Sequence, residues 1–146
     1  DVHDQLVRRL NEKLRRAYHQ IVDYELVEAQ DAEVVVVAYG STARSARQAV
    51  RLARKEKMRV GLLRPITLWP FPGHVVEELS ARVRAFVVAE LNLGQVAREV
   101  ERFTDRPVYG ANHAGGRMMP PELILPRIEE AYRDAQGSRR RYAPAG

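Results

Sequence analysis

The turn Gly40-Ser41-Thr42, followed by Arg44, contains the residue types in this sequence that best suit anion binding. It follows a β-branched run and precedes an amphipathic segment, so a strand should end and a helix begin there. A helix start offers unpaired N–H groups and the positive end of the helix dipole, and Arg44 adds a full charge. The turn could therefore hold a phosphate or a carboxylate. The alternative, which we favour, is that Ser41 caps the helix and Gly40 permits the turn.

A second strand-to-helix turn carries Glu90, Asn92, Gly94 and Gln95. In a parallel sheet the carboxyl ends of the strands share one edge, so this turn should lie on the same edge as the first. Its polar side chains could contact a ligand or a partner. Equally, Asn92 could be a turn residue and Glu90 a hydrogen-bonded strand end. The sequence leaves both interpretations open.

The stretch from Arg64 to Pro72 contains three of the eight prolines and the only tryptophan. Proline fixes φ and donates no backbone hydrogen bond, so this stretch cannot continue a helix or lie inside a sheet. We predict a stiff, extended loop that leaves the end of a strand. Its residues Arg64, Pro65, Trp69 and Phe71 are candidates for burial against a partner.

The composition restricts the possible chemistry. The sequence has no cysteine, which excludes disulfides, thiolate nucleophiles and cysteine-held iron–sulfur clusters within the chain. The four histidines are scattered, without metal-ligand spacing. The net charge of +5 is spread over helices that also carry acidic residues, so we do not expect nucleic-acid binding. Without an apolar run long enough to cross a bilayer, we expect a cytoplasmic protein with no membrane contact.

Hydrophobic periodicity divides the chain into a leading helix and an α/β domain. Leu6, Leu10 and Leu14 recur at helical spacing, and this stripe should pack on the following domain or on a neighbouring subunit. The unbroken run Val34–Val37 is typical of a strand buried on both faces of a parallel sheet. Strands are predicted at 33–39, 59–63, 85–90 and 107–110, and helices at about 3–24, 41–56, 73–80, 95–104 and 121–135.

We therefore predict a three-layer α/β fold, with a mainly parallel sheet covered by helices on both faces. Residues 1–30 should form a linker helix, residues 31–136 the α/β domain, and residues 137–146 a disordered basic tail. The chain begins with Asp1 and has no initiator methionine, which suggests a piece of a longer polypeptide.

Three strings, Val36–Ala46, Val60–Pro72 and Phe86–Gln95, together resemble a known family. It is the C-terminal domain of the α subunit of 2-oxoacid:ferredoxin oxidoreductases, a domain of the transketolase C-terminal type. The second string is the most specific of the three. Among the members of the family, the 2-oxoglutarate type is the most similar.

The resemblance implies a parent enzyme that oxidatively decarboxylates a 2-oxoacid to an acyl-coenzyme A. That enzyme uses thiamine diphosphate with Mg²⁺, takes coenzyme A as a substrate, and passes electrons through iron–sulfur clusters to ferredoxin. This chain has no thiamine-diphosphate motif, so we expect the fragment to bind none of these cofactors and to hold no catalytic residue. It should contact the remaining α-subunit domains and the β subunit, mainly through Arg64, Trp69 and Phe71.

Two other functions compete with this interpretation. The first is a free-standing module that binds an anion or coenzyme A through Gly40, Ser41, Thr42 and Arg44. The second, weaker alternative is an RNA-binding domain, whose binding would fall steeply with salt.

Overall fold

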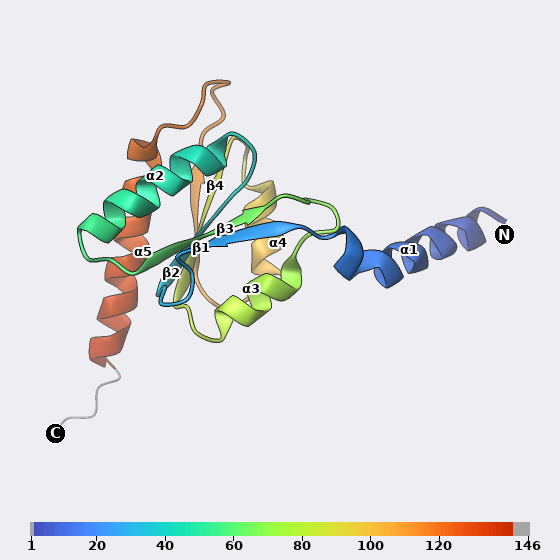
Figure 1. The fold of residues 1–146 in the computed structure, drawn as a ribbon, viewed down its shortest axis with the longest axis horizontal. Helices are drawn as coiled ribbons and strands as arrows, with labels where there is room; N and C mark the ends of the chain where they lie inside the picture. The colour runs from blue at the N-terminus through green and yellow to red at the C-terminus, as the bar shows by residue number, and fades with distance from the viewer. Residues whose placement is uncertain (1, 142–146) are drawn as a thin grey trace.

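The computed structural model describes residues 2–141. Helices and strands alternate through most of this range (Figure 1). In chain order they are α1 (Val2–Ile21), β1 (Tyr24–Val27), β2 (Val34–Ala38), α2 (Thr42–Lys55), β3 (Val60–Pro65), α3 (Gly73–Ser80), β4 (Ala85–Glu90), α4 (Gln95–Glu101), β5 (Val108–Asn112) and α5 (Pro121–Arg141).

The five strands form one sheet in the order β1-β3-β2-β4-β5. The β2–β3, β2–β4 and β4–β5 pairs are parallel, which confirms the predicted mainly parallel sheet. The chain passes from β2 to β3 on one side and then crosses to β4 on the other. The strand order therefore reverses between β2 and β4, the kind of position where open α/β sheets commonly bind ligands.

The structure differs from the predicted linker in two respects, the first being that residues 24–27 form a strand. Strand β1 pairs antiparallel with β3, with Tyr24 opposite Pro65 and Val27 opposite Leu62. Four residues are too few to reveal the period of two that marks a strand. The preceding helix also ends earlier than expected, at Ile21.

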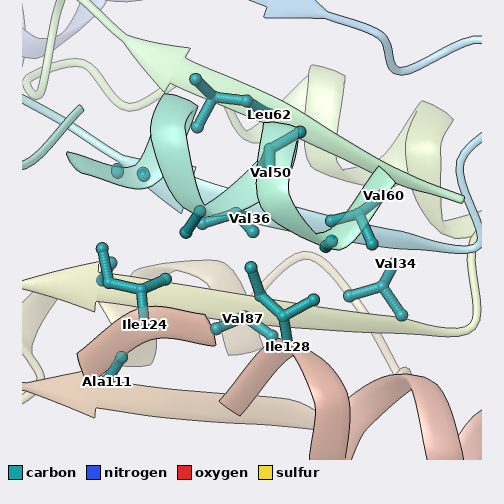
Figure 2. Packing of buried hydrophobic residues seen from close by; sticks show 14 of the residues in the cluster. Val34, Val36, Val50, Val60, Leu62, Val87, Ala111, Ile124 and Ile128 are labelled. Atoms are coloured by element: carbon teal, nitrogen blue, oxygen red, sulfur yellow. The ribbon is translucent and has the colours of Figure 1, made fainter. Parts of the chain in front are cut away.

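Helices cover both faces of the sheet, as predicted. On one face α2 and α5 pack over the strands, with Val50 and Ile128 among the side chains buried there (Figure 2). On the other face α3 and α4 enclose a second cluster that includes Val75, Phe86 and Val100. All residues of β2 are buried because this strand lies between the two layers.

Helix α1 extends away from the domain (Figure 1) and has no buried residue. Its predicted apolar stripe is therefore not covered by the rest of the described chain, and Leu6 and Leu10 are exposed. Only its C-terminal end is attached to the domain, and Tyr18 makes the main side-chain contacts there. No helix within residues 2–141 combines the length and apolar character needed to cross a membrane.

Helix α5 is longer than predicted and continues to Arg141. The expected disordered tail at 137–146 is therefore wrong for residues 137–141, while residues 142–146 lie outside the described part of the chain. Gln136 and the arginines that follow have good helix propensity, so the helix continues past Gly137.

Candidate functional site

The β2–α2 turn begins with Gly40, whose φ of +56° is in the left-handed region that favours glycine. Ser41 already has helical dihedral angles, and its hydroxyl makes no capping hydrogen bond. The interpretation of Ser41 as a side-chain cap is therefore wrong, because the capping geometry requires a non-helical residue. Thr42 is buried and Arg44 is exposed. The first turn of α2 carries no acidic residue to offset its positive end.

This turn lines one side of a cleft of about 490 Å³, which we call the arginine cleft. The cleft brings together two features predicted separately, the Gly40 turn and Arg64 at the end of β3. It also includes Arg47, a half-buried residue of α2 that was not among the predicted site residues. The complete lining is Gly40, Ser41, Ala43, Arg44, Arg47, Arg64 and Met118.

Glu25 of β1 joins two of these arginines. Its carboxylate accepts a hydrogen bond from Arg47 Nη2 at 2.8 Å and from Arg64 Nη1 at 3.3 Å. The hydrogen bond from Arg47, more than that from Arg64, lowers the pKa of Glu25 below its usual value. This arrangement could not be predicted, because the strand that carries Glu25 has no recognisable sequence pattern.

The β4–α4 turn lies on the same edge of the sheet, as expected. Here Asn92 Oδ1 accepts hydrogen bonds from the backbone N–H groups of Gly94 and Gln95 at 2.9 and 3.2 Å. Glu90 is fully buried, and its two carboxylate oxygens accept from Val96 N at 2.9 Å and Ala97 N at 3.2 Å. Both side chains thus bind the start of α4.

The two turns are linked directly across the switch point, the position between β2 and β4 where the strand order reverses. Asn92 Nδ2 donates to the Tyr39 hydroxyl over 2.8 Å, which connects the end of β4 to the end of β2. Burial, followed by the nearby charge of Glu90, raises the pKa of Tyr39. Gly94 has a φ of +100°, and a Cβ there would lie 3.3 Å from Asn112 Nδ2. Protein side chains therefore bridge the switch point itself, while the arginine cleft lies beside it.

The loop after β3 separates the two aromatic residues predicted to act together. Trp69, which precedes a cis peptide bond to Pro70, is 73% exposed, whereas Phe71 is only 6% exposed. Phe71 stacks on Phe103 with ring centroids 6.1 Å apart, inside the domain's own core. The prediction that Phe71 serves as an interface anchor is therefore wrong, because this ring is buried in the core beneath the loop. Pro65 is also buried, as the last residue of β3.

The loop is held against the end of α1. The Tyr18 hydroxyl donates to the Phe71 carbonyl oxygen at 2.8 Å and lies 2.9 Å from His74 Nδ1. Thr67 Oγ1 donates to the Ile21 carbonyl oxygen at 3.1 Å. Both α1 and the loop joined to it carry exposed apolar side chains. We call them the apolar surface: Leu6, Val7, Leu10 and Ile21 of α1, and Ile66, Leu68 and Trp69 of the loop.

The residues present do not form a site for the metal groups that the family resemblance implies. Within residues 2–141, no three His, Asp or Glu side chains group in a way that could hold a metal ion. The sequence also lacks the cysteines that usually hold an iron–sulfur cluster. Two of the scattered histidines do meet, since His19 and His74 lie with ring centroids 5.4 Å apart, both beside Tyr18.

Comparison with known proteins places this geometry in context. Residues 32–124 match the family model for the pyruvate:ferredoxin oxidoreductase core domain II. The 2-oxoglutarate synthase subunit KorA of Methanocaldococcus jannaschii is 40% identical over 126 residues, covering 85% of this chain and 34% of that protein. The ketoisovalerate oxidoreductase subunit VorB of Methanothermobacter thermautotrophicus is 39% identical over 127 residues, covering 86% and 36%. The chain thus spans about a third of the length of these relatives.

Two solved structures have the same fold. The 2-oxoglutarate:ferredoxin oxidoreductase from Magnetococcus marinus superposes with a TM-score of 0.76 at 23% identity, covering 90% of this chain and 24% of that one. A split-gene transketolase gives 0.64 at 18% identity, covering 76% and 41%. The predicted transketolase C-terminal type of fold is confirmed.

Proposed function

Because this chain belongs to the pyruvate:ferredoxin oxidoreductase core domain II family, we propose that it acts as the C-terminal domain of an α subunit in a 2-oxoacid:ferredoxin oxidoreductase. The parent enzyme converts a 2-oxoacid and coenzyme A to carbon dioxide and an acyl-coenzyme A, and two electrons pass to ferredoxin. The similarities to KorA and VorB support a 2-oxoacid such as 2-oxoglutarate or ketoisovalerate as the substrate. The cysteine-free sequence agrees with a cytoplasmic location.

Thiamine diphosphate with Mg²⁺ supplies the decarboxylation chemistry in such an enzyme, and iron–sulfur clusters carry the electrons. Within residues 2–141 no side-chain cluster suits the Mg²⁺ ion, and the sequence has no cysteine to hold an iron–sulfur cluster, so we place the reaction in the other α-subunit domains and in the β subunit. This domain positions those parts by docking against them. Its contribution is structural, and the isolated chain has no activity of its own.

The exposure of Trp69 is the observation that carries the docking role. A tryptophan that is 73% exposed costs hydration free energy unless a partner covers it, and tryptophan often dominates interface energetics. The surrounding loop is fixed by the bonds of Tyr18 and Thr67 to neighbouring backbone, so little conformational entropy is lost on docking. The exposed stripe of α1 is joined to this loop and extends the apolar surface.

The test is assembly of the α subunit that contains this chain with its β subunit, measured by sedimentation. We expect Trp69→Ala to raise the dissociation constant about tenfold or more. Leu123→Ala is the matched control, since Leu123 is an exposed apolar residue on α5, outside the apolar surface. Equal assembly of the wild type and the Trp69 variant would remove the docking role.

A further inference from the structure

The arginine cleft carries more positive charge than the domain itself neutralises. Three guanidinium groups line it, from Arg44, Arg47 and Arg64. Glu25 is the carboxylate that pairs with two of them. The Arg44 guanidinium makes no hydrogen bond or ion pair within residues 2–141, and Arg64 Nε is buried without a hydrogen-bond partner there. Two positive charges therefore remain in excess at one concave site.

From this arrangement we infer that the arginine cleft binds a small molecule carrying a phosphate or diphosphate group. Guanidinium groups match phosphate oxygens with paired, charge-assisted hydrogen bonds, and several arginines together favour a multiply charged anion. Glu25 keeps Arg47 and Arg64 in place before binding, which lowers the entropy lost when the anion arrives.

The backbone around the cleft agrees with such a ligand. The N-terminal end of α2 contributes a positive helix end that no acidic residue of its first turn offsets. The exposed Ser41 hydroxyl is not used in capping and is available as a donor. A Cβ at Gly40 would meet no atom within 4 Å, so the approach to the turn is open.

The size of the cleft favours a small molecule over an acidic side chain of a protein partner. At about 490 Å³ it falls within the range of about 300–1,000 Å³ typical of small-molecule sites. A single aspartate or glutamate side chain would leave most of this volume unfilled. The protruding apolar surface, by contrast, has the shape expected for protein docking, so the two sites are independent and so are their tests.

The experiment is titration calorimetry of the 146-residue chain with pyrophosphate, inorganic phosphate and succinate at constant ionic strength. We expect saturable binding of pyrophosphate, weaker binding of phosphate, and little binding of succinate. Arg44→Ala should raise the dissociation constant for pyrophosphate about tenfold. Arg51→Ala is the matched control, since it removes the same charge two turns further along α2, outside the cleft.

Each other outcome would overturn the inference. Absence of saturable heat with pyrophosphate would leave the cleft to a partner's carboxylate instead. Equal weakening by Arg44→Ala and Arg51→Ala would show general charge attraction without a site. Equal binding of succinate and pyrophosphate would remove the preference for phosphate. A negative result in the calorimetry would not affect the docking role of Trp69. A negative result in the assembly experiment would likewise not affect the inference about the arginine cleft.

Discussion

Glu25 and Arg47 are 22 residues apart in the sequence, and a 2.8 Å hydrogen bond joins their side chains. The bond connects β1, the antiparallel edge strand, to α2, the helix that begins at the arginine cleft. The carboxylate of Glu25 therefore has two effects: it fastens the edge strand, and it holds two guanidinium groups of the cleft in position.

We expect the stabilising effect of Glu25 to depend on pH. The folded-state pKa of this carboxyl lies below its ordinary value of 4.5, chiefly through the hydrogen bond from Arg47. A lowered pKa gives stability that is present above 4.5 and is lost as the pH falls through the folded-state value. Urea unfolding from pH 7 to pH 3 should show the difference between wild type and Glu25→Gln shrinking below pH 4.5. Glu78→Gln, on the exposed side of α3, is the control, and a constant difference for Glu25→Gln would contradict the expectation.

Truncation of the two aromatic residues of the loop should change the free energy of unfolding by very different amounts. Phe71→Ala removes a core ring stacked on Phe103 and should lower the free energy of unfolding by about 3–5 kcal/mol. Trp69→Ala should change it by less than about 0.5 kcal/mol, because the indole is mostly in solvent. Urea unfolding of the isolated chain measures both. A large loss for Trp69→Ala would mean that the ring supports the fold.

Glu90→Gln should destabilise the domain by about 1–3 kcal/mol, because the amide nitrogen would face a backbone N–H group that now bonds to a carboxylate oxygen. The loss should be localised, with faster hydrogen exchange at Val96 and Ala97. Glu101→Gln at the exposed end of α4 provides the comparison. If both variants unfold at the same urea concentration as wild type, the capping role of Glu90 is wrong.

Tyr18→Phe should loosen α1 while leaving the domain folded. The hydroxyl bonds to the Phe71 carbonyl and His74 attach the end of α1, and their loss should cost about 1 kcal/mol. Distances between spin labels at exposed positions of α1 and α2 should become more widely distributed. Tyr24→Phe is the control, since no hydrogen bond of its hydroxyl is observed among the described residues. An unchanged distribution in Tyr18→Phe would show that backbone bonds alone set the orientation of α1.

Much of the fold followed from the sequence because β2 and β4 are fully buried and carry unbroken apolar runs. The Gly40 and Asn92 turns were located correctly for the same reason, since each follows such a strand. Strand β1 escaped prediction because an edge strand of four half-exposed residues has no distinct pattern.

The composition of the cleft was only partly predictable. Arg44 and Arg64 were identified, but Arg47 resembled the other arginines on the outer face of α2. Its role depends on Glu25, and that contact is set by the pairing of β1 with β3. Local pattern also failed to separate Trp69 from Phe71, because the burial of Phe71 depends on its packing against Phe103, which is distant in the sequence.

The short strand at residues 24–27 changes where this domain should be cut for study. The family match starts at residue 32, beyond β1, yet among residues 2–141 β3 has no other neighbour on that side. A protein expressed from residue 32 would present the bare N–H and C=O groups of β3 to solvent, a template on which further copies can stack. Versions that begin at residue 32 should therefore aggregate, whereas a version that begins ahead of Tyr24 should remain monodisperse.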